Sequence, residues 1–191
     1  MTIFGHGGFE MKKGVFSYLA LALILSMLHL SAPQEVRAEE KVKKPYTVTL
    51  QSKDGKVVGE AKLVETNNGV VIQVIAEGFD PGFHGIHFHE TGKCEGPDFI
   101  SAGEHFNPFK KEHGLKNPKG PHAGDLRNVN ADAQGKINTT FITPRVTLMK
   151  GKENSLRDLD GSALVIHQNV DDQMTNPSGN SGARIVCGVI K

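Results

Sequence analysis

The sequence predicts an all-β fold, an antiparallel barrel or sandwich that carries two long functional loops. Short segments of alternating apolar and polar residues recur along the chain and are separated by turn signals, the pattern of strands joined by tight turns. No segment has the apolar stripe of a helix, and two long stretches without a regular period interrupt the strands. Such a succession of short strands is typical of a barrel or a sandwich.

The first strands are predicted as an antiparallel meander. "YTVTLQS" (46–52) alternates in polarity, "GKVVGEAKLVE" (55–65) follows the turn signal "KDG", and "GVVIQVIAEG" (69–78) follows "ETNNG". Glycine and asparagine at these turns favour tight hairpins, which join antiparallel strands.

The remaining strands are predicted on either side of two irregular segments. The chain has the following order: strand "GIHFHE" (85–90), irregular segment 91–134, strands at 135–142, 145–148 and 162–168, irregular segment 169–182, and a last strand, "ARIVCGVI" (183–190). The first irregular segment is far longer than ordinary loops of compact domains, and loops of this length are usually functional or disordered. It contains three of the chain's nine histidines.

The first 38 residues have the features of a secretory signal peptide. "MKKG" from Met11 supplies positive charge, "VFSYLALALILSML" (15–28) is uncharged and apolar, and "VRA" ends at Ala38 as a cleavage site. Met11 is an alternative translation start, because the residues before it fit no part of a signal. The apolar run is short for a membrane span, which needs about 20 residues, although an uncleaved anchor is the alternative. We expect a secreted protein without a stable membrane span after processing, either released or loosely associated with the cell surface.

The rest of the chain is interpreted as a charged tether, "EEKVKK" (39–44), followed by one domain, 45–191. A chain of this length suffices for one domain with a real core. Without residues 1–38, 19 basic residues face 19 acidic ones. This balance argues against a nucleic-acid partner, which requires a concentrated basic surface.

The two cysteines, Cys94 and Cys187, both lie in the part expected to be exported. Because an oxidising compartment favours pairing, we expect them to form one disulfide. No cysteine precedes Cys94, so cleavage at this signal cannot produce a lipid-modified N-terminal cysteine.

The histidines predict a metal site. His87 and His89 in "HGIHFHE" (84–90) project to the same face of a strand, about 6.5 to 7 Å apart, and can share one ion. His84 is interpreted as an ordinary core residue. The downstream candidates are His105, His113, His122, Asp125 and His167.

The number of candidate ligands indicates two ions. Six imidazoles and one carboxylate exceed the needs of one tetrahedral site. Four nitrogens suit copper, and three histidines with one aspartate suit zinc. Seven ligands for two four-coordinate ions require one shared residue, and the count leaves open which residue bridges.

The motifs resemble those of the copper/zinc superoxide dismutase family, of the bacterial secreted type. The matching strings are "GFHGIHFHETG", "GEHFNP", "KKEHG", "GPHAGDLRN", "GSALVIH", "DD" and "GNSGARIVCGVI", in this order over nearly all of residues 45–191. The resemblance implies an eight-stranded antiparallel Greek-key β-barrel and one copper and one zinc ion per subunit.

The resemblance also implies the role of each site residue. Copper would be held by His87, His89, His105 and His167, and zinc by His105, His113, His122 and Asp125, so that His105 is the bridge. Asp171 would link His87 to His113 through their free ring N–H groups, and Arg184 would be the arginine of the substrate channel.

The implied activity is the conversion of superoxide to dioxygen and hydrogen peroxide by copper redox cycling, with His105 as the proton carrier. A buffer or carrier of copper and zinc, with incidental activity, is the alternative function. A zinc hydrolase is less consistent with the sequence, because a hydrolase needs an open coordination position on zinc and four protein ligands leave none.

Two departures from the family pattern change what we expect of steering and assembly. The segment between Gln173 and Ala183 contains no charged residue, so superoxide would be steered less strongly, or by lysines elsewhere: Lys110, Lys111, Lys116 and Lys119. The chain ends four residues after Cys187 and has Thr91 where eukaryotic members have an aromatic dimer contact. We therefore do not expect a eukaryote-style dimer.

Overall fold

The computed structural model describes residues 44–191, so the predicted signal peptide and all but the last residue of the tether lie outside the described residues. Within this part of the chain, no helix has both the length and the hydropathy to cross a membrane.

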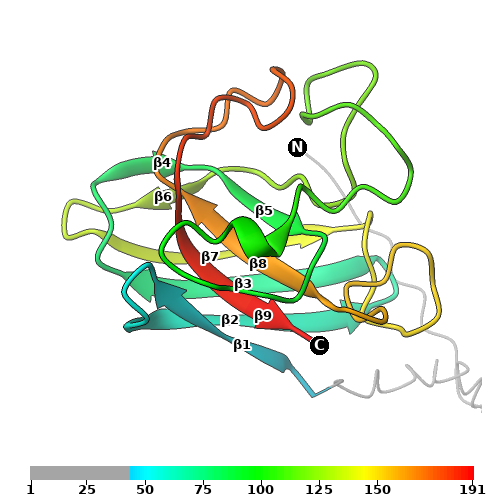
Figure 1. Cartoon of the computed structure of the whole chain (residues 1–191), viewed down its shortest axis with the longest axis horizontal. Helices are drawn as coiled ribbons and strands as arrows, with labels where there is room; N and C mark the ends of the chain where they lie inside the picture. Colours follow the sequence, from blue (N-terminus) through cyan, green and yellow to red (C-terminus); the bar gives the residue numbers. More distant parts are fainter. Residues whose placement is uncertain (1–43) are drawn as a thin grey trace, which may run out of the picture. The chain divides into compact units, whose positions relative to one another are not determined.

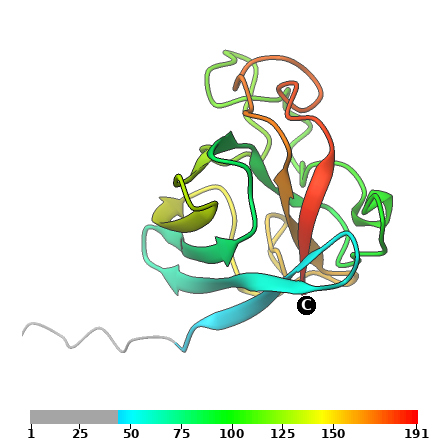
Figure 2. The same cartoon turned by 90° about the vertical axis from the view of Figure 1, so that its left-hand side faces the viewer.

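The described chain is built from β-strands that form one large sheet and one small one (Figure 1). The strands are β1 (Tyr46–Ser52), β2 (Val57–Thr66), β3 (Gly69–Glu77), β4 (Gly82–His84), β5 (Ile86–His89), β6 (Val129–Ala131), β7 (Lys136–Thr143), β8 (Ser162–His167) and β9 (Arg184–Ile190); a short 3-10 helix, η1, spans Ile100–Ala102. The large sheet has the order β5-β8-β9-β1-β2-β3-β7, and β4 pairs with β6. Because β1 pairs with both β2 and the last strand, β9, the sheet curves around the core, as Figure 2 shows.

The predicted all-β Greek-key barrel is confirmed. The predicted strand at 85–90 belongs to a longer extended segment that the structure divides at Gly85 into β4 and β5; counted as one, they give the eight predicted strands. A Cβ atom at Gly85 would lie 2.9 Å from Ser181 Cβ and 3.3 Å from Asp171 Cβ, so glycine lets the segment with these two residues pack closely against the strand. Asp171 is thereby brought next to the strand that carries His87.

Two predictions of secondary structure were wrong. Residues 145–148 do not form a strand, because Thr147 Oγ1 and the Leu148 N–H donate to the carboxylate of Glu65 instead of a strand ladder; Thr147 makes only an isolated bridge to Ser155. The irregular segment 91–134 contains the 3-10 helix η1 and the strand β6, which has only three residues and therefore too short a pattern to detect.

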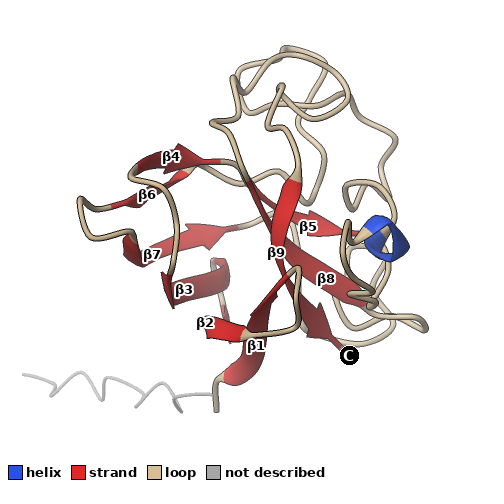
Figure 3. Ribbon diagram, turned by 60° about the vertical axis from the view of Figure 1, so that its left-hand side comes forward, coloured by secondary structure: helices blue, strands red, loops and turns tan. Residues whose placement is uncertain are grey.

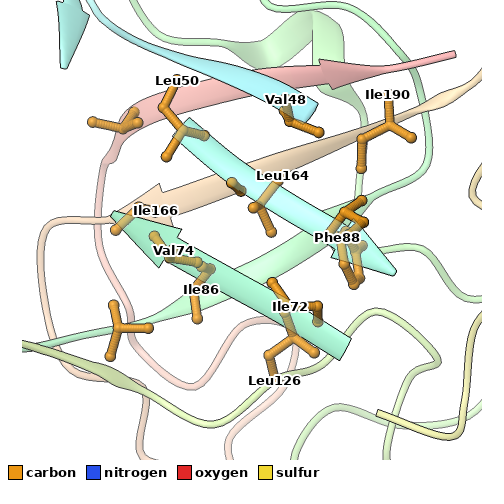
Figure 4. Close-up of a cluster of buried hydrophobic side chains, with 14 of the residues drawn as sticks. Val48, Leu50, Ile72, Val74, Ile86, Phe88, Leu126, Leu164, Ile166 and Ile190 are labelled. Carbon is orange, nitrogen blue, oxygen red and sulfur yellow. The ribbon is translucent and has the colours of Figure 1, made fainter. Parts of the chain in front are cut away.

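The core lies between the walls of the barrel (Figure 4). Its side chains come from strands of both sheets and from the segment before β6; those labelled in Figure 4 are Val48, Leu50, Ile72, Val74, Ile86, Phe88, Leu126, Leu164, Ile166 and Ile190. All are nearly inaccessible to solvent, and burial of each large aliphatic or aromatic side chain contributes about 1.5 to 3 kcal/mol. The barrel is therefore a rigid support for the loops outside it.

The loops gather at one side of the barrel. The segment that contains His113 and His122 and the segment 169–182 lie together beyond one end of the strands (Figures 1 and 3). The Cys94–Cys187 disulfide, which confirms the predicted pairing, fastens the segment before η1 to β9, with the two Cα atoms 5.7 Å apart. Loops distant in sequence thus converge over β5 and β8.

Candidate metal centre

Strand β5 separates the core from the candidate centre. Ile86 and Phe88 belong to the core cluster, whereas His87 and His89 alternate with them on the opposite face. The His87 and His89 ring centroids are 6.4 Å apart, close to the spacing expected of alternate strand residues. Both rings are buried under the loops, so two imidazoles face one enclosed site.

Four buried ring nitrogens in this site have no hydrogen-bond partner among the described residues. They are His87 Nδ1, His89 Nε2, His105 Nε2 and His167 Nε2. The four histidines place their ligand atoms within 4.8 Å of one another. A buried polar nitrogen without a partner is unfavourable, so four that converge indicate a common ligand.

In His89 and His167, a backbone carbonyl holds the ring nitrogen that is not the unpaired one. His89 Nδ1 lies 2.9 Å from the carbonyl oxygen of Gly103, and His167 Nδ1 lies 3.2 Å from that of Gly182. Since a carbonyl only accepts, each Nδ1 carries the proton and each Nε2 exposes its lone pair to the cluster.

Burial keeps this histidine cluster neutral. Desolvation, followed by repulsion from His105, lowers the pKa values of His87 and His89 well below the ordinary value. Desolvation also lowers the pKa of His105, and it brings that of His167 to about 4, although the Gly182 carbonyl opposes the shift. At neutral pH the cluster therefore presents lone pairs, the form of imidazole that binds metals.

A second cluster surrounds one carboxylate oxygen of Asp125. Oδ1 lies 2.9 Å from His105 Nδ1, 3.0 Å from His113 Nδ1 and 3.2 Å from His122 Nδ1. Oδ2 accepts from the backbone N–H groups of Gly114 and His122, which fixes the carboxylate. Three nitrogens and one oxygen thus converge on one point.

His105 faces both clusters, because Nε2 belongs to the first and Nδ1 to the second. The ligand atoms of His87, His105, His113 and Asp125 also lie within 4.8 Å of one another. We place His87 in the first cluster nevertheless, because its Nε2 is bonded to Asp171 and its unpaired Nδ1 lies with the first set. His122 completes the second set through its contact with Asp125.

Asp171 connects the two clusters. Its Oδ2 accepts from His87 Nε2 at 2.8 Å, and its Oδ1 accepts from His113 Nε2 at 3.0 Å. Its backbone is held by the side-chain amide of Asn128, which contacts the Asp171 N–H and C=O groups at 2.9 and 2.8 Å. One buried carboxylate therefore orients a ring in each cluster.

The second cluster has the opposite electrostatic character from the first. Burial disfavours the charged form of His113, but the hydrogen bonds that His113 donates to Asp125 and Asp171 outweigh burial and raise the pKa of His113 to about 9. Burial also acts against ionised Asp125 and Asp171, yet hydrogen bonds from the histidines hold both pKa values well below the ordinary range. These carboxylates are charged at neutral pH, which suits a site for a cation.

The donor sets fit copper and zinc. Four uncharged imidazole nitrogens are an accepted copper set, and three imidazoles with one carboxylate are typical of tetrahedral zinc. Ligand atoms about 2.0 to 2.2 Å from a tetrahedral zinc ion lie about 3.3 to 3.6 Å from one another. The contacts around Asp125 Oδ1, between 2.9 and 3.2 Å, approach this spacing.

Arg184 lies at the edge of the first cluster. It is the register partner of His167 across β8 and β9, and it is half-buried. Burial lowers its pKa, whereas Glu104, Asp98 and Glu90 oppose the shift; a guanidinium stays charged at neutral pH in any case. A hollow of about 420 Å³ beside it is lined by Lys53, Pro97, Asp98, Gly182, Ala183 and Arg184.

The predicted metal ligands and Asp171 thus lie together in one buried region with Arg184 at its edge, while His84 stands apart. Its ring nitrogens each lie 2.9 Å from a backbone carbonyl, those of His167 and Asp80, as expected of a core residue. Sequence reasoning missed Lys53, Asn128 and Gln173. For Asn128 the string "DLRN" was a signal, because it places this residue close to the ligand Asp125. Lys53 and Gln173 have no local sequence pattern that indicates the site.

Comparisons with known proteins agree with this geometry. Residues 57–190 match the family model described as copper/zinc superoxide dismutase. The chain is 51% identical over 138 residues to "Superoxide dismutase [Cu-Zn] 1" of Aquifex aeolicus, a match that covers 72% of this chain and 82% of that protein.

Solved structures give the same result. A SOD-like protein from Bacillus subtilis superposes with a TM-score of 0.75 at 46% identity, over 78% of this chain and 100% of that one. The Cu/Zn superoxide dismutase from Brucella abortus superposes with a TM-score of 0.64 at 31% identity, over 78% and 100%. With its two histidine clusters and the disulfide, the chain belongs to the copper/zinc superoxide dismutase family.

Proposed function

We propose that the first cluster holds copper and the second holds zinc, one ion of each per subunit. The copper ligands are His87 Nδ1, His89 Nε2, His105 Nε2 and His167 Nε2; the zinc ligands are the Nδ1 atoms of His105, His113 and His122 with Oδ1 of Asp125. The position of His105, whose two ring nitrogens face different clusters, is the observation that carries this assignment.

The activity is the conversion of two superoxide anions and two protons to dioxygen and hydrogen peroxide. Copper, when bound, supplies the one-electron redox chemistry, whereas zinc has none and supplies a fixed charge. His105 would carry a proton at Nε2 whenever that nitrogen does not hold copper, because its Nδ1 is kept on the zinc side beside Asp125. Asp171 keeps His87 and His113 in the tautomers that expose Nδ1 to the ions.

Arg184 attracts the substrate. Its position opposite His167 puts a permanent cation at the edge of the copper cluster. A half-buried cation interacts with an anion more strongly than a fully solvated one does, because less water screens it. Lys53, which lines the same hollow as Arg184 and Asp98, adds a second positive charge to the approach. The exposed lysines of segment 110–119 remain candidates for longer-range steering.

The protein acts outside the cytoplasm. Residues 1–38 have the features of a cleaved signal, and the Cys94–Cys187 disulfide is of the kind that persists in oxidising compartments. We expect release into that compartment, with loose surface association as the alternative.

Metal analysis combined with a superoxide assay tests the proposal. Protein purified without metal is loaded with zinc and then copper, metal content is measured, and the decay of superoxide is followed. We expect one copper and one zinc ion per chain. We also expect superoxide to decay rapidly, at a rate that does not saturate as the superoxide concentration rises. If the protein binds both metals but superoxide decays no faster than in buffer without protein, the result would instead support a metal carrier.

A further inference from the structure

We propose that Gln173 is a positioning residue for the metal centre, one that holds the carboxylate of Asp171 in the orientation required by both clusters. This inference rests on the proposed ligand roles of His87 and His113, which Asp171 contacts. Gln173 lies in the segment 169–182, which the sequence shows to be free of charged residues from Gln173 to Ala183.

Gln173 doubles the hydrogen bonding of the Asp171 carboxylate. Its backbone N–H donates to Asp171 Oδ1 at 2.6 Å, and its side-chain Nε2 donates to Oδ2 at 2.7 Å. Each carboxylate oxygen therefore receives one bond from a histidine and one from Gln173, since His113 donates to Oδ1 and His87 to Oδ2. Four donors from three residues fix the plane of the carboxylate, and a carboxylate held in this way fixes the rings bonded to it.

The orientation of the Gln173 amide is determined by its neighbours. Nε2 also donates to the carbonyl oxygen of Leu126 at 3.1 Å, so both groups in front of it are acceptors. The amide must present its NH₂ group to them, which leaves Oε1 buried and without a hydrogen-bond partner among the described residues.

Gln173 occupies its position at a cost to the fold. The unpaired Oε1 is buried, and the backbone has φ 64°, in the left-handed region that residues with side chains rarely adopt. A shape-matched apolar side chain would remove the first cost. The unpaired Oε1 and the left-handed backbone are both unfavourable for the fold. Because Gln173 contacts Asp171, which connects the two clusters, these features indicate a role in the site rather than in stability.

The carbonyl of Gln173 extends the same link to the loop on the zinc side. It accepts from the backbone N–H of Lys116 at 3.0 Å, three residues after His113. It also lies so close to Gly114 that a Cβ atom there would collide with it. Gln173 thus contacts the two loops that lie together in Figures 1 and 3 and ties both to Asp171.

The test is the zinc affinity of Gln173→Met, measured on metal-free protein by competition with a chromophoric zinc chelator. The methionine side chain matches glutamine in length but cannot donate to Asp171 Oδ2 or to the Leu126 carbonyl, while the backbone N–H bond to Asp171 Oδ1 remains. We expect zinc binding about tenfold weaker or more, the range found when a partner of a metal-bound histidine is lost. The melting temperature of the metal-free variant should stay close to that of the parent, because removal of the buried unpaired Oε1 offsets part of the cost of the two lost hydrogen bonds.

Gln134→Met is the matched control. Gln134 also donates its backbone N–H to an aspartate two residues earlier, Asp132, but it is exposed and lies in the turn between β6 and β7. The zinc affinity of Gln134→Met should equal that of the parent. Gln173→Gly is a second variant, since glycine accepts the left-handed backbone while it removes the side chain, and its zinc affinity should fall as well.

The outcomes separate the two levels of the proposal. Zinc affinity of Gln173→Met within twofold of the parent's would overturn the positioning role. A second result would also overturn it: Gln173→Met binds zinc more weakly and loses an equally large amount of stability without metal, while Gln173→Gly binds zinc normally. If the parent itself binds no zinc, the ligand assignment fails, and the role of Gln173 fails with it.

Discussion

Arg184 donates a hydrogen bond of 2.8 Å to the backbone carbonyl of Phe99, at the start of the 3-10 helix in the segment that the disulfide fastens to β9. The arginine and Cys187 lie on the same strand, and their partners, Phe99 and Cys94, lie on the same segment. The disulfide thus holds the carbonyl that orients the guanidinium.

Loss of the disulfide should affect both stability and activity. Cys187→Ser opens a covalent loop with a sequence separation of 93 residues, and we expect a loss of about 2 to 5 kcal/mol in the free energy of unfolding. Activity below the unfolding temperature should also fall, because Phe99 no longer fixes Arg184. Denaturant titration and a superoxide assay on the same sample measure the two effects. Two alkylatable thiols in the exported parent would contradict the account.

Arg184→Glu should separate substrate capture from metal binding. Arg184 lies outside both ligand sets, so copper and zinc content should be unchanged. A negative charge beside the copper cluster repels superoxide at short range, and activity should drop tenfold or more, roughly 1.4 kcal/mol of transition-state stabilisation. The exposed Arg127→Glu is the control for the change in net charge.

The salt dependence of the same variants gives a second readout. Parent activity should decline with added salt, because salt screens the attraction between a positive approach and an anion. In Arg184→Glu this decline should disappear or reverse. A fully metallated variant that matches the parent at low and at high salt would mean that Arg184 is an ordinary surface charge.

Lys53→Glu tests the second cation of the approach. Lys53 lines the hollow beside Arg184, so the change should lower the rate about two- to fivefold at low salt and by less at high salt. Lys136→Glu, at an exposed position that starts β7, should leave the rate within error of the parent. Equal rates for the two variants would exclude Lys53 from steering.

Removal of the metals should destabilise the domain. Without ions, Asp125 keeps a buried negative charge and the copper cluster keeps four unpaired nitrogens. Zinc present at about 1,000 times its dissociation constant should restore about 4 kcal/mol. Magnesium, which prefers oxygen ligands, should not. Calorimetry of chelator-treated protein with each ion measures this, and identical melting with and without zinc would refute the second site.

The fold was largely predictable from periodicity. The alternation in residues 46–52 gave a strand with the same bounds as β1, and the segments after "KDG" and "ETNNG" gave β2 and β3 within two residues. Residues 145–148 have the same kind of pattern but bond to the side chain of Glu65. A partner 82 or 83 residues away in the sequence leaves no local signal.

The residues of the candidate site were predictable as a set, because histidine and aspartate at motif spacing carry metal chemistry wherever the chain brings them together. The groups that hold them were harder to foresee. His89 and His167 are oriented by the backbone carbonyls of Gly103 and Gly182, which any residue could supply. In the sequence Gln173 is only the start of an uncharged segment, because the residue type does not reveal its left-handed backbone or its bond to Asp171.

The superoxide decay rate of His105→Ala, loaded with both metals and expressed per copper bound, tests the central claim most directly. His105 is proposed to face copper through Nε2 and zinc through Nδ1, so its loss should disturb both sites and remove most of the activity. The barrel should stay folded, because the core lies on the opposite face of β5. A His105→Ala protein that binds both metals and destroys superoxide as fast as the parent would contradict the bridge.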